Sequence, residues 1–113
     1  MESLPEVLAV RPAGAGVELD LAVPADLAWF PDHFPRLAML PGVVQLDWAI
    51  RYGREHLRVP GTFRRVAGLK FQHPILPGAR VTLALGQPRP GELAFAYRNP
   101  QRPCSSGRVV FAA

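Results

Sequence analysis

The chain has 113 residues, of which 49% are hydrophobic and 19% charged, a composition typical of one folded domain spanning 1–113. Its net charge of +4 comes from dispersed basic residues with no aromatic-basic ladder, so nucleic-acid binding is not expected. The single cysteine excludes an internal disulfide and a cysteine-based zinc cluster. The N-terminus has no signal-peptide pattern, and no uncharged apolar run reaches the roughly 18 residues that span a bilayer. We therefore expect a cytoplasmic protein without a membrane span.

Two strands are predicted first along the chain. Residues 4–11 and 16–23 alternate apolar and polar side chains, as half-buried strands do, and a glycine-rich turn joins them. A short turn or helix is predicted at 26–30, where Asp26 can cap the exposed amides. Two prolines then bracket His33 and favour a stiff, non-helical loop around it.

One long helix is predicted from about residue 41 to residue 57. A proline-glycine pair at 60–61 ends it. Val44 and Trp48 widen its apolar surface, so we expect the helix to be buried on most of its circumference. The residues that define its apolar stripe recur close to the 3.6-residue period: Val43, Leu46, Ala49, Ile50, Gly53 and Leu57.

Four more strands are predicted after the helix, at about 62–73, 79–87, 92–99 and 106–112, separated by proline- and glycine-rich turns. A single antiparallel sheet of about six strands can bury such a helix only by wrapping around it. The predicted fold class is therefore α+β, with the sheet wrapped around one long central helix.

Two motifs flank the helix and point to a family. The triplet His33-Phe34-Pro35 is followed after five residues by Pro41-Gly42, and after four more by Asp47. The second motif, KFQHPILPG, covers 70–78. Together they resemble the hot-dog fold 3-hydroxyacyl-acyl-carrier-protein dehydratases (FabZ/FabA-like). The segment LPGVVQLDWAI is most similar to the ApeI-like dehydratases of aryl-polyene clusters.

The chain departs from the family pattern at three positions. The family usually has glycine after the HFP triplet and proline two residues later, where this chain has Arg36 and Ala38. It often has glutamine four residues after the acid, where this chain has Arg51. These departures bear on whether the site is fully active.

The resemblance implies a catalytic pair, His33 and Asp47, with the backbone N–H of Gly42 binding the thioester oxyanion. Dehydration needs a base for the C2 proton, and an imidazole that titrates near neutral pH suits this step. A carboxyl group in an apolar setting suits departure of the C3 hydroxyl. An unpaired N–H at a helix start suits the developing negative charge. The resemblance also implies a homodimer with shared sites, an acyl carrier protein as the substrate's carrier, and no cofactor or metal.

The residues leave other interpretations open. Arg51 either points to solvent or pairs with Asp47, which then acts as an anion that orients water and His33 while the histidine moves the proton. His33 is alternatively a structural loop residue and Asp47 a solvated helix residue. His56 and His73 are expected to be structural.

Two further groups of residues have assigned expectations. Acyl-tunnel lining, or simply core, is expected for Phe34, Met39, Trp48 and Phe71. Carrier-protein docking, or simply a solvated basic face, is expected for Arg54, Arg58, Arg64, Arg65, Lys70 and Arg80. The predicted function is dehydration of a 3-hydroxyacyl thioester to the trans-2-enoyl thioester in fatty-acid or polyene/polyketide biosynthesis. The alternatives are a hot-dog thioesterase and a non-catalytic acyl-binding or assembly subunit.

Overall fold

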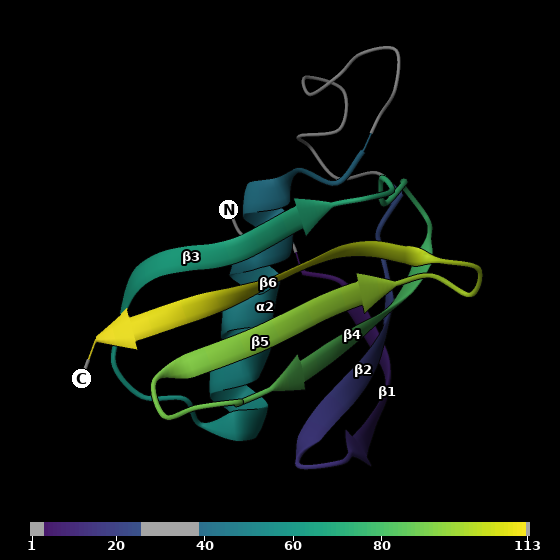
Figure 1. The fold of residues 1–113 in the computed structure, drawn as a ribbon. Coiled ribbons are helices and arrows are strands. Elements are labelled where there is room, and N and C mark those ends of the chain that lie inside the picture. Colours follow the sequence, from purple (N-terminus) through teal and green to yellow (C-terminus); the bar gives the residue numbers. More distant parts are fainter. Residues whose placement is uncertain (1–3, 26–38, 113) are drawn as a thin grey trace.

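A computed structural model describes residues 4–25 and 39–112. The described chain forms one antiparallel sheet, with strand order β1-β2-β4-β5-β6-β3, and one helix that crosses a face of this sheet (Figure 1). The α+β prediction is confirmed, while Asp26 and the element expected at 26–30 lie outside the described residues. The elements, in chain order, are β1 (Glu6–Ala13), β2 (Gly16–Ala22), α2 (Gly42–Leu57), β3 (Thr62–Phe71), β4 (Arg80–Gly86), β5 (Glu92–Arg98) and β6 (Pro103–Ala112).

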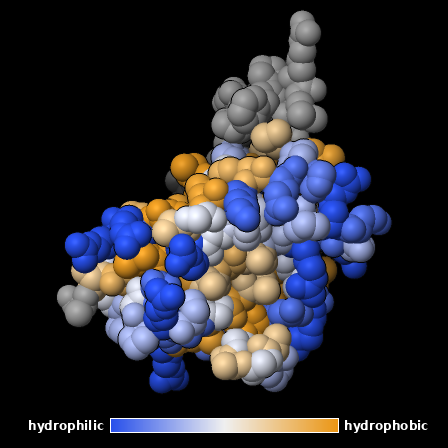
Figure 2. Space-filling view, in the orientation of Figure 1, coloured by the Kyte–Doolittle hydropathy of each residue, from blue (hydrophilic) through white to orange (hydrophobic). Residues whose placement is uncertain are grey.

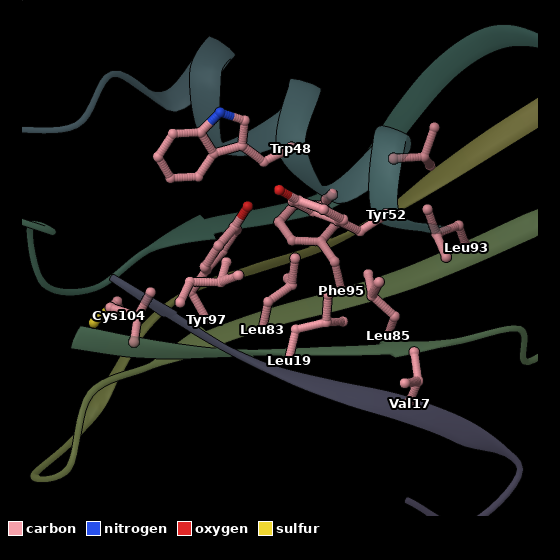
Figure 3. Close-up of a cluster of buried hydrophobic side chains, with 14 of the residues drawn as sticks. Val17, Leu19, Trp48, Tyr52, Leu83, Leu85, Leu93, Phe95, Tyr97 and Cys104 are labelled. Atoms are coloured by element: carbon pink, nitrogen blue, oxygen red, sulfur yellow. The ribbon is translucent and has the colours of Figure 1, made fainter. Parts of the chain in front are cut away.

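The core lies between α2 and the sheet. Side chains of β2, β4 and β5 alternate between buried and partly exposed, as expected for strands with one covered face. Leu19, Leu83 and Tyr97 are fully buried on the covered face. Figure 3 shows these side chains pointing toward Trp48 and Tyr52 of α2. Burial of these apolar and aromatic groups is the main term that holds the helix on the sheet.

The buried side of α2 differs from the predicted stripe. It consists of Gln45, Trp48, Ala49, Tyr52 and Gly53, which follow the helical period but start at a polar residue. The predicted stripe was wrong at its start, because the side chain of Val43 is 76% exposed. The helix is also less enclosed than expected, with one long side open. Within the described residues, no helix is both long and apolar enough to cross a bilayer.

Strand β6 begins three residues earlier than the sequence indicated. The strand was predicted from residue 106, yet Cys104 and Ser105 are buried within it. A tight turn makes this possible, because the side-chain oxygen of Asn99 accepts hydrogen bonds from the backbone N–H groups of Gln101 and Arg102, each at 2.8 Å. The turn closes the β5–β6 hairpin at once and lets the start of β6 pair with the end of β5.

Candidate active site

A cavity of about 370 Å³ lies at the N-terminal end of α2. It is formed by the segment that leads into the helix, the first helical turn, the end of β3 and the loop that follows β3. In Figure 1, β3 runs toward this end of the helix. We call it the site cavity. Its lining residues are Met39, Leu40, Pro41, Gly42, Gln45, Phe71, Gln72, His73 and Pro74.

Backbone hydrogen bonds join the two sequence motifs at this cavity. The N–H of Leu40 donates to the carbonyl of Ile75 at 2.7 Å, which fixes the entry to the helix against the second motif. The N–H groups of Gln72 and His73 both donate to the carbonyl of Cys104, at 2.8 and 3.1 Å. The walls of the cavity are therefore set by main-chain contacts to β6.

Buried Gln45 holds the helix start in place. Its side-chain Nε2 donates to the carbonyl of Leu40 at 3.1 Å, and its Oε1 accepts a 2.6 Å hydrogen bond from Oγ of Ser105. The hydroxyl of Tyr97 donates to the backbone carbonyl of Gln45 at 2.6 Å. Burial raises the pKa of Tyr97 well above its usual value, so this hydroxyl stays protonated and remains a donor. We call these contacts the Gln45 clamp.

Gly42 lies where the resemblance placed it, as the first residue of α2 and in the wall of the site cavity. The N–H of a first helical residue has no intrahelical acceptor and lies at the positive end of the helix dipole. The ring of Phe71 covers the residue closely, because a Cβ on Gly42 would lie 2.6 Å from the ring's Cζ. Only glycine leaves room here without moving that ring.

Asp47 lies on the second turn of α2 but does not line the site cavity. Its side chain is 56% exposed, and its Oδ2 accepts a 2.9 Å hydrogen bond from Nε of Arg51. Of the two arrangements open for Arg51, the structure therefore shows the ion pair. The candidate acid is therefore exposed and lies apart from the site cavity.

The remaining predicted residues fall into three places. His33, Phe34 and Arg36 lie outside the described residues. Met39 and Phe71 line the site cavity, whereas Trp48 does not: it is fully buried in the core, the alternative that the sequence left open.

The predicted docking residues are divided along the molecule. Arg54 and Arg58 are at the C-terminal end of α2, and a rise of about 1.5 Å per residue puts Arg54 about 18 Å along the helix from Gly42. The guanidinium of Arg54 also lies 4.6 Å from the ring centroid of Phe111. Lys70 is near the end of β3, beside the site cavity, and Arg80 begins β4.

Sequence reasoning missed Gln45, Ser105 and the place of His73 in the cavity wall. A polar residue on the buried helical stripe was the one available signal for Gln45. Ser105 carries no local signal, since its partner is 60 residues away in the chain. Within the described residues, no cluster of three or more potential ligands is placed to hold a metal ion.

Comparison with known proteins decides the family. A family model described as "ApeI-like: ApeI dehydratase" matches residues 10–108. The chain belongs to the ApeI-like dehydratase family. It is thus a dehydratase, as predicted.

Solved structures agree with this assignment. A chain of "The Dehydratase Heterocomplex ApeI:P from Xenorhabdus doucetiae" is similar with a TM-score of 0.87 and 29% identity, over 98% of this chain and 100% of that one. An uncharacterized protein from Erwinia carotovora subsp. atroseptica has a TM-score of 0.82 and 37% identity, over 97% of each chain. The dehydratase domain of a mycocerosic acid synthase-like polyketide synthase is similar in fold, with a TM-score of 0.68 and 20% identity, over all of this chain and 42% of that one. Searching the curated proteins gives no match. The hot-dog fold prediction is confirmed.

Proposed function

We propose that this ApeI-like dehydratase removes water from a 3-hydroxyacyl thioester on an acyl carrier protein and forms the trans-2-enoyl thioester of a polyene or fatty-acid pathway. The observation that carries the proposal is the site cavity, a pocket of about 370 Å³ that has Gly42, the first residue of α2, in its wall. Family membership supplies the reaction class. The place of Gly42 in the cavity wall, as the first residue of α2, supports its backbone N–H as the oxyanion donor.

The proposed chemistry assigns one proton path. His33 takes the C2 proton as the thioester oxygen gains negative charge beside the N–H of Gly42. The imidazolium then gives that proton to the C3 hydroxyl, which leaves as water while the C2–C3 double bond forms. Asp47, held by Arg51, acts as the anion that orients the leaving water and the imidazolium.

We propose that the complete site forms between two subunits. Strand β3 is at one edge of the sheet, and its outer edge has no strand partner among the described residues. Phe63, Leu69 and Phe71 of this strand are about half exposed, and exposed Val43 lies on the neighbouring helix. A long, exposed, apolar edge strand offers unpaired backbone groups and an apolar surface with which another chain can pair. The resemblance pairs the histidine of one subunit with the acid of its partner, and the exposed side chain of Asp47 is open to such a contact.

Absorbance of the conjugated enoyl product tests the reaction itself. His33→Ala should lower kcat by roughly 100-fold or more while the circular dichroism spectrum stays native. Activity within a few fold of wild type would remove His33 from the mechanism. Release of free thiol in place of the enoyl product would instead identify a thioesterase.

Mixing of variants tests the shared site. Mixed dimers of His33→Ala and Asp47→Ala subunits contain one intact site, so activity should partly return once subunit exchange has been shown by mass spectrometry. No recovery despite exchange would place each site within one subunit. The solution mass of the purified chain separates a homodimer from a chain that needs a second, different dehydratase subunit, as the name of the Xenorhabdus doucetiae heterocomplex indicates for that assembly.

Carrier-protein docking through the basic residues stays a prediction. Arg64 and Arg65 lie near the start of β3, at the opposite end of the strand from Phe71 and Gly42, so we expect them to contact the body of a carrier protein. Replacing both with glutamate should lower the activity on carrier-protein substrates and leave small thioesters unaffected. Raising the salt concentration should reduce this difference, whereas equal losses on both substrates would indicate damaged folding.

A further inference from the structure

A second cavity, of about 630 Å³, lies at the end of the sheet where the β5–β6 turn projects. Figure 2 shows hydrophilic residues gathered around this turn, at the right of the view. Three arginines line the cavity: Arg80 at the start of β4, Arg98 at the end of β5 and Arg102 in the turn. We call it the arginine pocket. The mechanism above makes no use of it.

The charges around the arginine pocket do not balance. The carboxylate of Asp20 accepts hydrogen bonds from Arg11, at 2.7 Å, and from the hydroxyl of Thr82, at 2.8 Å. Glu18 accepts hydrogen bonds from both Arg11, at 3.0 Å, and Arg98, at 3.2 Å. The two carboxylates of Glu18 and Asp20 are thus outnumbered by four positively charged arginines: Arg11, Arg80, Arg98 and Arg102.

Arg80 carries part of this excess charge, since it makes no hydrogen bond or ion pair with any other residue that the structure describes. An excess of positive charge with donors in reach is what an anion requires, and planar guanidinium groups suit phosphate in particular.

The arginine pocket adjoins the site cavity through one contact. Nη1 of Arg102 lies 3.3 Å from Nδ1 of His73, and His73 lines the site cavity. A guanidinium has only donors, so the imidazole nitrogen is the acceptor in this contact. The Arg102–His73 pair therefore separates the two cavities, because Arg102 lines the arginine pocket and His73 lines the site cavity.

We infer that the arginine pocket binds the phosphate of the pantetheine arm on which the acyl thioester is carried, an inference that rests on the proposed function. The thioester end of such an arm enters the site cavity, and its phosphate lies in the arginine pocket beyond His73. Arg80 and Arg102 contact the phosphate directly. Arg98, fixed by Glu18, contributes its positive field.

The test compares two substrates that differ only in the phosphate. One is a 3-hydroxyacyl thioester of pantetheine 4′-phosphate, and the other is the same acyl group on pantetheine. The double variant Arg80→Gln and Arg102→Gln should lose about 10-fold or more in kcat/KM on the phosphorylated substrate. Its kcat/KM on the phosphate-free substrate should change by less than about twofold. The control, Arg89→Gln, removes an exposed positive charge elsewhere, leaves Glu92 paired with Arg108, and should keep both values near wild type.

Two outcomes would overturn the arginine pocket while the dehydratase function stands. In one, the double variant keeps the wild-type preference for the phosphorylated substrate. In the other, the kcat/KM of the double variant falls equally on both substrates, which would mean that Arg102 acts only by positioning His73. A wild-type protein that dehydrates neither substrate, nor the carrier-protein thioester, would overturn the proposed function instead.

Binding without turnover then tests the arginine pocket independently. Titration calorimetry should show that wild type binds pantetheine 4′-phosphate more tightly than pantetheine, and that the double variant loses this difference. No preference in wild type would overturn the inference. Coenzyme A and carrier-protein thioesters share the phosphate, so the double variant should lose kcat/KM on both, and the wild-type values rank the two sources.

Discussion

Replacing Gln45 with methionine should destabilise the protein and, at the same time, disturb the proposed oxyanion site at Gly42. Methionine has nearly the same volume and helix propensity as glutamine, so neither a cavity nor a change in the backbone preference is introduced. What it removes is the pair of hydrogen bonds from the Gln45 amide to Leu40 and Ser105. Both bonds are buried.

The size of the effect follows from the two groups left without a partner. The carbonyl of Leu40 and the hydroxyl of Ser105 each lose a buried hydrogen bond, at a cost of about 1–3 kcal/mol apiece. Part of this loss is offset because the variant no longer has to bury the polar amide group of Gln45. We expect the free energy of unfolding to fall by about 2–4 kcal/mol. At about 4 °C per kcal/mol, the Tm should fall by about 8–16 °C.

Urea unfolding of wild type, Gln45→Met, Ser105→Ala and the double variant tests this reasoning. Removing both partners leaves no unsatisfied hydroxyl, so the double variant should lose about 1–2 kcal/mol less than the sum of the single losses. At a temperature where Gln45→Met is still folded, its kcat should also fall, because Leu40 no longer holds the chain next to Gly42. A single-variant loss below about 0.5 kcal/mol, or strictly additive losses, would refute the clamp.

Two further predictions concern the rest of the fold. Gly53→Ala should lower the free energy of unfolding, measured in urea, by about 1 kcal/mol. A Cβ at this position would collide with fully buried Leu93, and the cost of this collision outweighs the gain in helix propensity. A more stable variant would show that the side chain of Leu93 has room to move. Hydrogen bonds from Arg11 and Thr82 lower the pKa of Asp20, so its contribution to stability is present above about pH 4 and is lost as the pH falls through the lowered value. Asp20→Asn should therefore lower the Tm at pH 7 and have little effect near pH 2, and a pH-independent difference would contradict the ion pair.

Local patterns predicted the fold well because most of its strands have one covered face. Apolar and polar side chains alternate along β2, β4 and β5 because one face of these strands is buried. Their predicted bounds therefore lie within two residues of the bounds in the structure. The start of β6 was missed because its residues read as a polar turn. Hydrogen bonds of the Asn99 side chain and backbone with the residues after it shorten that turn and bring Cys104 into the sheet.

The site was predictable only where the two motifs supply it. The proline-glycine pair placed Gly42 at the helix start, and Phe71 of the KFQHPILPG segment was expected to line an acyl tunnel or the core. Partners distant in the chain could not be found in this way. The pairing of Gln45 with Ser105 depends on which strand ends up beside α2, and the Arg102–His73 pair depends on the path of two loops.

The helical period explains why one subunit holds only part of the proposed site. At about 100° per residue, Gln45 lies about 60° from Gly42 around the axis of α2, whereas Asp47 lies about 140° away in the other direction. Gly42 and Gln45 can therefore face the site cavity together, while Asp47 must point elsewhere, as its exposure shows. No rotation of a rigid helix brings all three to one cavity. A role for Asp47 in the reaction therefore depends on the proposed site between two subunits, which is why the proposed exchange experiment is the decisive test of that role.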